Sequence, residues 1–229
     1  MENHMKDAEK IHGVTAAGEY DHLIGSIVPG QSLLISTTLE YLPDNPGRIL
    51  ELGCGTGILT EQILERFPGA EITGIDLSPD MLRVASEKPG LRNVHFIAGD
   101  LRDAWPAGPY DAIVTSLCIH HISAAERVTV VKRAYKALSR GGRFVCGDIF
   151  LGESGREEEI FLEYWLKGMK KAGIPDDVIR GMNAARNERR PELRPVSWFR
   201  TILLETGFSP VIIPFTAGFA GLVVGFMPE

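Results

Sequence analysis

The sequence predicts an α/β fold around a parallel sheet, because strand-like and helix-like segments alternate along most of it. Five short apolar runs lie between residues 48 and 150, and helical patterns or turn clusters separate them. Strands that alternate with helices at this spacing indicate a parallel sheet with helices on both faces. The 229 residues are enough for one large α/β domain or two small ones.

The first segment, residues 1–45, is predicted to be an N-terminal helical cap. Residues 1–19 are expected to be frayed or to hold a short helix, and residues 32–42 carry a helical apolar stripe after the turn at Pro29-Gly30. The breaker cluster PDNPG at 43–47 separates this cap from the alternating segments.

The alternating segments follow in order as strand and helix. The expected strands are RILELGC, EITGIDL, NVHFIAGD, YDAIVTSLC and RFVCGDIF. Ser78-Pro79 predicts a helix start, with a cap residue followed by proline at the first helical position. Ser123 and Glu126 form a capping-box pattern before another helix, and SRGG at 139–142 is expected to stop it.

The last third changes character, because three helical stretches precede two final strand-like runs. Ser154 and Glu157 form a second capping-box pattern. An insertion of about residues 153–195 is therefore expected within a domain of residues 46–229. PVIIPF and GLVVGFM are expected to be the last two strands.

Composition and charge exclude some classes of function. The net charge of −6 argues against a general nucleic-acid binder or an anionic-membrane binder. Cys54, Cys118 and Cys146 have no metal-site spacing and are expected to be free thiols, which predicts a cytoplasmic protein. The polar N-terminus does not resemble a signal peptide, and no apolar run approaches the roughly 20 residues that span a bilayer. The apolar residues Ile27, Val28 and Leu33 predict either a homodimer interface or a cover over a ligand.

The stretch ILELGCGTG predicts a loop that admits a ligand close to its backbone. Gly53, Gly55 and Gly57 follow a strand and open a helix, so a helix N-terminus and bare backbone meet at this point. A dinucleotide fingerprint needs a small third residue, and Ile58 occupies that position. The lysine of a phosphate-binding Walker loop is also missing. The loop is therefore poorly suited to a pyrophosphate.

Two further strand ends carry carboxylates. Asp76 ends the second strand, where an acid can accept hydrogen bonds from both ribose hydroxyls. Asp100 ends the third strand, and the backbone N–H of Leu101 beside it suits a purine ring. Because the carboxyl ends of parallel strands share one edge of the sheet, the three strand ends are expected to form one site.

These motifs, with YDAIVTSLCIHHI and LSRGGRFVCGDIF, resemble the successive motifs of class I S-adenosylmethionine-dependent methyltransferases over about residues 46–150. The resemblance implies a Rossmann-like, doubly wound, seven-stranded sheet whose last strand is antiparallel. It implies S-adenosyl-L-methionine as the cofactor and S-adenosyl-L-homocysteine as the product. The cofactor contacts that it implies are Glu51, Gly53, Gly55, Gly57, Asp76, Leu77, Asp100, Leu101, Ser116 and Leu117.

Residues 20–42, the helical insertion and the ending FTAGFAGLVVGF resemble more narrowly the carboxy-S-adenosylmethionine synthase family and small-molecule methyltransferases of the same layout. That synthase family holds the extra carboxylate with an arginine near the last helix. Arg200 lies in this helix, at a position offset from the family's relative to Gly207-Phe208. The synthase is therefore kept as an alternative function.

Methyl transfer needs a positioned nucleophile and exclusion of water, and it needs a base only if the nucleophile arrives protonated. His120 and His121 follow the fourth strand, so either is a candidate base or a loop residue that shapes the pocket. Tyr20 is a third candidate catalytic residue. The resemblance suggests that Tyr20 and Asp21 form a lid over the cofactor, and core packing of Tyr20 is the alternative. A two-histidine metal site is not predicted, because no carboxylate lies nearby in the sequence.

Candidate acceptor-binding residues come from the second half. Tyr164 and Trp165 are expected to line an aromatic pocket or to pack in a core, and Arg200 is the third candidate. Asp148 and Glu153 flank the end of the fifth strand, as bases or as helix-start acids. Three arginines either form a solvated helix face or hold an anionic substrate: Arg186, Arg189 and Arg190.

The sequence therefore predicts methyl transfer from S-adenosylmethionine to a small-molecule acceptor, without general nucleic-acid or membrane binding. The alternatives are the carboxy-S-adenosylmethionine synthase, a nicotinamide-dependent dehydrogenase and a non-catalytic cofactor-binding subunit. The sequence leaves the acceptor and its attacking atom open.

Overall fold

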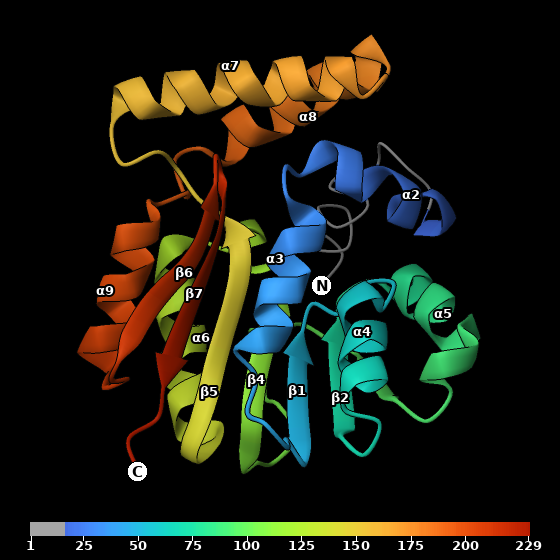
Figure 1. Ribbon diagram of the computed structural model, residues 1–229, viewed down its shortest axis with the longest axis vertical. Helices are drawn as coiled ribbons and strands as arrows, with labels where there is room; N and C mark the ends of the chain where they lie inside the picture. Colours follow the sequence, from blue (N-terminus) through green and yellow to red (C-terminus); the bar gives the residue numbers. More distant parts are fainter. Residues whose placement is uncertain (1–16) are drawn as a thin grey trace.

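One sheet of seven strands forms the centre of the computed structural model, which describes residues 17–229 (Figure 1). The strand order is β3-β2-β1-β4-β5-β7-β6. The strands are β1 Arg48–Leu52, β2 Glu71–Asp76, β3 His95–Ala98, β4 Tyr110–Ser116, β5 Leu138–Ile149, β6 Val211–Ala217 and β7 Ala220–Phe226. The first five are parallel, and β7 runs antiparallel to both β5 and β6. The predicted α/β fold with an antiparallel last strand is confirmed.

Helices cover both faces of this sheet and one of its edges. They are α2 Ala17–Ile27, α3 Gln31–Glu40, α4 Ile58–Arg66, α5 Pro79–Glu87, α6 Ala124–Ala137, α7 Gly155–Lys171, α8 Asp176–Arg189 and α9 Val196–Thr206. Two short 3₁₀ turns, Pro89–Leu91 and Ile119–His121, complete the described elements. Figure 1 shows α7 and α8 above the carboxyl ends of the strands, with α2 beside them.

The central strands are mostly apolar because both of their faces are buried. In β1, Ile49 belongs to the core on the α3 and α4 side, whereas Leu50 and Leu52 belong to the core on the α6 and α9 side. All three side chains are fully buried. Burial of such a side chain contributes about 1.5–3 kcal/mol, which favours this two-sided strand over a surface position.

Local signals set the helix starts as the sequence predicts. Ser78 caps α5 by accepting from the Met81 N–H. Ser123 caps α6, and the Glu126 side chain accepts in return from the Ser123 N–H at 2.7 Å. These reciprocal bonds satisfy N–H groups that a helix end leaves without partners.

Two local predictions need correction. Ser154 caps α7, but the Glu157 carboxylate accepts from the Glu153 N–H, so the second capping box is only half formed. Helix α6 ends at Ala137, just before the segment SRGG. However, SRGG lies inside β5, which begins at Leu138 rather than at the predicted Arg143. A register shift opposite Tyr110 and Ala112 accommodates the extra residues.

The predicted N-terminal cap is divided between two places. Its residues 1–16 lie outside the described part of the chain. The α3 residues Leu34 and Ile35 pack in the core on the α3 and α4 face of the sheet, whereas the α2 residues Ile24 and Ile27 pack with α7. The domain boundary near residue 45 therefore stays a prediction.

A third apolar cluster joins α2 and α7 above the carboxyl ends of the strands. Trp165 is central to it, and its Nε1–H donates to the Ile27 carbonyl at 2.7 Å. Phe219, in the turn between β6 and β7, packs edge-on against Trp165. We call α2, α7 and α8 the lid helices. Within residues 17–229, none of the helices has the length and apolar character that a bilayer crossing requires.

Candidate functional site

A cavity of about 490 Å³ lies between the carboxyl ends of the central strands and the lid helices. The cavity lies at the ends of the neighbouring strands β1 and β4. From β1 the chain continues to β2 on one side of this pair, and from β4 it continues to β5 on the other side. Open α/β sheets bind their ligands at such a point. Of the residues predicted to form the site, those that line it are Tyr20, Glu51, Gly53, Gly55, Asp76, Leu77, Asp100, Leu101, Ser116, Leu117, His120, His121 and Trp165.

The glycine loop after β1 has the backbone geometry that its sequence predicts. Gly53, Gly55 and Gly57 have φ values of 69°, 55° and 79°, a region that side chains disfavour. A Cβ on Gly53 would lie 2.0 Å from the Cys118 Sγ, so this position has no room for a side chain. Gly57 lies outside the cavity wall and serves packing instead, because a Cβ there would meet Leu91 at 2.5 Å.

Asp76 connects the glycine loop to β2. Its Oδ2 accepts from the Gly55 N–H, and its Oδ1 accepts from the Ser78 N–H, both at 2.8 Å. The carboxylate therefore fixes the loop while it lines the cavity. A carboxylate has about four acceptor positions, so it can also accept from a ligand hydroxyl.

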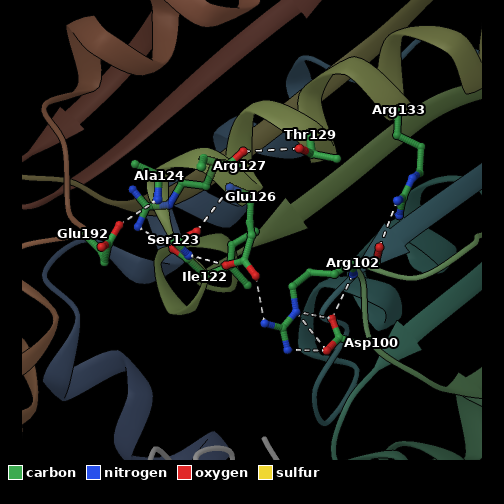
Figure 2. A network of polar contacts seen from close by, with 11 residues as sticks. Asp100, Arg102, Ile122, Ser123, Ala124, Glu126, Arg127, Thr129, Arg133 and Glu192 are labelled. Carbon is green, nitrogen blue, oxygen red and sulfur yellow. Dashed lines mark hydrogen bonds and ion pairs between the residues drawn. The ribbon is translucent and has the colours of Figure 1, made fainter. Parts of the chain in front are cut away.

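Asp100 is held by a residue that the sequence analysis missed. Figure 2 shows Arg102 between Asp100 and Glu126, with Nη2 2.5 Å from Asp100 Oδ2 and Nη1 3.0 Å from Glu126 Oε1. The Asp100 carboxylate raises the pKa of the Arg102 guanidinium, which stays charged. Glu126 also caps α6, so this network ties the end of β3 to that helix. No spacing in the sequence signals this long-range ion pair.

A buried acid, Glu51, lies beneath the glycine loop. Thr60 Oγ1 donates to Glu51 Oε2 at 2.6 Å, and only 1% of Glu51 is exposed. Burial and the nearby Asp76 charge raise the pKa of Glu51 to about 8, although the Thr60 hydrogen bond opposes this. Glu51 is therefore mostly protonated at pH 7.

The end of β4 has an unusual backbone that directs side chains into the cavity. Leu117 has a φ of 51°, which is uncommon for a residue with a branched side chain. Its N–H donates to the Gly147 carbonyl on β5 at 2.8 Å, which holds the bend. Residues Ile119–His121 then form a 3₁₀ turn that carries both histidines.

His120 forms a pair with Asp148, which lies at the end of β5. The Asp148 Oδ1 lies 2.5 Å from His120 Nδ1, and its Oδ2 accepts from the His120 backbone N–H at 2.9 Å. The Asp148 side chain is 2% exposed, whereas that of His120 is 15% exposed and lines the cavity. The His121 ring lies 3.9 Å from that of His120. This geometry fixes the imidazole with Nδ1 toward the carboxylate.

Tyr20 and Asp21 bring α2 to the glycine loop. Asp21 accepts from Thr56 Oγ1 at 2.5 Å and pairs with Lys88 Nζ at 2.8 Å. Burial and the Asp76 charge raise the pKa of Tyr20 well above its ordinary value. Its phenol therefore stays protonated and is suited to donate a hydrogen bond rather than to act as a base.

The candidates from the second half separate into two groups. Trp165 lines the cavity, but Tyr164 points to solvent and is 72% exposed. Arg200 is exposed on α9, where its Nε donates to the Val211 carbonyl, and it is not part of the cavity wall. A helix directs neighbouring residues to different sides, which explains the separation of Tyr164 from Trp165.

The arginines of α8 do not form one solvated face. Arg186 is 7% exposed and pairs with Glu158 at 2.8 Å, and both Arg186 and Arg189 line the cavity. Arg190 is exposed and lies outside this cavity. The solvated interpretation is therefore wrong for Arg186, because α8 packs against α7 and turns this side chain inward.

The three cysteines are free thiols, as predicted. Cys54 and Cys146 are buried and Cys118 is partly buried, and burial raises the pKa of each thiol. Each thiol therefore holds its proton more tightly than an exposed cysteine does. Within residues 17–229, no group of three or more His, Cys, Asp and Glu side chains has a metal-binding arrangement.

Comparisons with known proteins agree with this geometry. Residues 49–142 match a family described as "Methyltransferase domain". A malonyl-[acyl-carrier protein] O-methyltransferase of Bacillus anthracis is 34% identical over 111 residues, which are 48% of this chain and 40% of that protein. A trans-aconitate 2-methyltransferase of Streptomyces avermitilis is 44% identical over 85 residues, 35% of this chain and 32% of that protein. The chain thus spans less than half the length of these curated relatives.

Solved structures show the same fold. Human N-acetylserotonin methyltransferase, solved with S-adenosylmethionine, superposes with a TM-score of 0.59 over 97% of this chain and 57% of its own, at 14% identity. The matched domain, the sheet topology and the glycine loop support a class I S-adenosylmethionine-dependent methyltransferase.

The residues of the cavity fit the cofactor of this class. The wall beside the glycine loop carries Asp76 and Asp100 for hydroxyl and amino groups, and Ile58 fills the space near the helix start. Neither lysine nor arginine occurs in the glycine loop, residues 53–57. These two carboxylates suit the hydroxyl and amino groups of a nucleoside. The wall therefore fits a nucleoside that carries a sulfonium cation and no phosphate better than it fits a dinucleotide.

Proposed function

We propose that this protein transfers a methyl group from S-adenosylmethionine to a protonated nucleophile on a small-molecule acceptor. The observation that carries the proposal is that His120, which is paired with Asp148, lines the same cavity as the glycine loop. A base and a cofactor loop in one enclosed space are what this reaction requires.

The proposed cofactor contacts are those that line the cavity beside the glycine loop. Asp76 would hold the ribose, and Asp100 and Leu101 would hold the adenine. Gly53 and Gly55 would contact the methionine part. The carbonyls of Ser116 and Leu117 would accept from the amino group. Glu51 and Leu77 would shape the cavity wall. Gly57 would only hold the turn of the glycine loop and would not contact the cofactor.

The chemistry divides between cofactor and chain. When bound, S-adenosylmethionine supplies a methyl group on an activated sulfonium centre. Asp148 holds His120 with its Nδ1–H toward the carboxylate, so the Nε2 lone pair is left to accept a proton. His120 Nε2 would accept the proton that the acceptor oxygen or nitrogen loses. Asp148 then stabilises the imidazolium that forms.

The lid helices would exclude water during this step. Tyr20 and Trp165 close the cavity from α2 and α7, and Asp21 fastens α2 to Thr56 and Lys88. Exclusion of water strengthens the electrostatic interactions within the site and prevents hydrolysis.

The relatives' names do not converge on one acceptor. They include malonyl-[acyl-carrier protein], trans-aconitate and, in Thermus thermophilus, demethylmenaquinone, and each match covers less than half of the relative. These matches support methyl transfer, and the acceptor is left to the shape and charge of the cavity. The exposed position of Arg200 gives no support to the synthase alternative.

The test is release of S-adenosylhomocysteine from S-adenosylmethionine in the presence of a panel of hydroxyl and amine acceptors. His120→Asn should lower kcat about 100-fold or more, the usual scale for a lost general base, without weakening S-adenosylhomocysteine binding. The control His95→Asn changes an exposed histidine at the start of β3 and should leave kcat unchanged. Equal turnover by His120→Asn and His95→Asn would contradict the assignment of the base.

A further inference from the structure

One arginine of α6, Arg127, reaches back to the 3₁₀ turn that carries the two histidines. Its Nε donates to the Ile119 carbonyl at 2.9 Å, and its Nη2 donates to the Ile122 carbonyl at 2.8 Å. Ile119 begins the turn and Ile122 follows it directly, so the two hydrogen bonds enclose His120 and His121. A single guanidinium therefore holds both ends of this turn.

The position of Arg127 makes these two hydrogen bonds rigid. The residue is only 4% exposed, so water has little access to the donors and to the carbonyls that they bind. A guanidinium is planar and presents its donors in a fixed fork, and hydrogen bonds from a charged group are stronger than those between neutral groups. The spacing of the two carbonyls is therefore set by the side chain of Arg127.

The charge of Arg127 also acts on the carboxylate that holds His120. Burial lowers the pKa of Arg127, and the Asp148 carboxylate opposes this effect. An arginine keeps its proton in proteins, so the group is a cation. Arg127 is thus linked to the His120–Asp148 pair twice, through the backbone of the turn and through the charge of Asp148.

The same helix holds the loop that is proposed to bind the adenine. Figure 2 shows Arg133 further along α6, where its Nη2 donates to the Arg102 carbonyl at 2.9 Å. Its Nη1 donates to the Leu101 carbonyl at 3.2 Å. One helix therefore binds the backbone of both the histidine turn and the loop after β3, which fixes the place of His120 relative to the cofactor loop.

We propose that Arg127 is a positioning residue for methyl transfer, which fixes the turn so that His120 keeps its Nδ1 on Asp148 and its ring at the cavity wall. Arg127 is not part of that wall, so it acts through His120 and not on the acceptor. A base must lie within hydrogen-bond reach of the proton that it accepts, and a small misplacement costs much of the rate. This inference rests on the proposed function and adds a residue to its base.

The experiment compares three variants in the wild-type and in the His120→Asn background. Arg127→Met removes both hydrogen bonds and the charge, and Arg127→Lys keeps the charge without the planar fork. The control Lys132→Met removes an exposed positive charge from the same helix. The release of S-adenosylhomocysteine gives kcat, and calorimetry gives the affinity for S-adenosylhomocysteine.

We expect Arg127→Met to lower kcat about tenfold or more at unchanged affinity for S-adenosylhomocysteine. Arg127→Lys should recover part of the loss, and Lys132→Met should change kcat less than about twofold. In the His120→Asn background, Arg127→Met should have less than about a twofold effect, because the group that it positions is already missing. If Arg127→Met does not fold, Arg127→Lys carries the same comparison between the two backgrounds.

Nuclear magnetic resonance tests the geometry without turnover. At about pH 9, where ordinary imidazoles are neutral, the nitrogen shifts of the unliganded, isotope-labelled protein tell which ring nitrogen carries the proton. The His120→Asn variant assigns the signals of His120. In the wild type the proton should lie on Nδ1. In Arg127→Met, and less so in Arg127→Lys, the proton should shift toward Nε2, whereas Lys132→Met should match the wild type.

Three results would overturn the inference. They are equal kcat in Arg127→Met and Lys132→Met, an equal loss from Arg127→Met with and without His120, or an unchanged His120 tautomer in both Arg127 variants. Failure of the proposed function has a different signature, because the wild type then releases no S-adenosylhomocysteine or His120→Asn turns over as fast as the wild type. The tautomer of His120 is read without any chemistry, so it decides the inference in that case as well.

Discussion

Glu51→Gln should change how the stability of this protein depends on pH. The pKa of Glu51 is about 8 in the folded chain, against 4.5 for the ordinary group, because the side chain is fully buried near Asp76. An acid whose pKa rises on folding keeps its proton longer when folded. Its contribution to stability is therefore full below the ordinary pKa and is lost as the pH rises toward the folded value.

The magnitude follows from these two values. Each pKa unit corresponds to about 1.4 kcal/mol, so the wild type should lose about 3–4 kcal/mol through this group between about pH 5 and pH 8. Glutamine resembles the protonated acid, and its carbonyl can still accept from Thr60 Oγ1. The variant should therefore lack this loss.

The assay is urea unfolding of both proteins, without cofactor, at several pH values. Other groups contribute equally to both, so the difference in their free energies of unfolding isolates Glu51. Relative to the wild type, the variant should gain about 3–4 kcal/mol as the pH rises from about 5 to 8. A difference that stays constant across this range would refute the assigned pKa.

Three further predictions test other parts of the site. Asp76→Ala should weaken S-adenosylhomocysteine binding by about 1–3 kcal/mol in calorimetry, because hydrogen bonds to a charged group are lost; unchanged affinity would remove Asp76 from the ribose site. Asp148→Asn should lower kcat at least about tenfold at unchanged S-adenosylhomocysteine affinity, because His120 loses its orienting carboxylate, and an unchanged kcat would contradict the pair. Gly53→Ala should destabilise the fold by about 1–2 kcal/mol or more in urea, because its φ is positive and its Cβ would meet Cys118; a neutral result would mean that the loop relaxes.

The fold was predictable because its signals are local. Strand runs such as residues 48–54 are mostly apolar, and Ser78 and Ser123 lie at their expected helix starts. The cofactor side of the cavity follows from the same signals, because parallel strands bring their ends to one edge. Asp76 and Asp100 therefore line the cavity beside the glycine loop.

The rest of the site depends on contacts between distant segments. His120 and Asp148 are 28 positions apart, and they meet only because β4 and β5 are neighbours. Arg102 pairs with Glu126, which is 24 positions away, and no local pattern signals this contact either. The inward face of α8 is set by its packing on α7, so the helical pattern did not separate Arg186 from Arg190.

The most direct test of the central claim is calorimetric titration of the purified protein with S-adenosylhomocysteine, and separately with NAD⁺. The assigned cavity predicts saturable binding of one S-adenosylhomocysteine per chain and no saturable binding of NAD⁺. Absence of S-adenosylhomocysteine binding, or tighter binding of NAD⁺, would contradict the assignment of the glycine loop and of the function built on it.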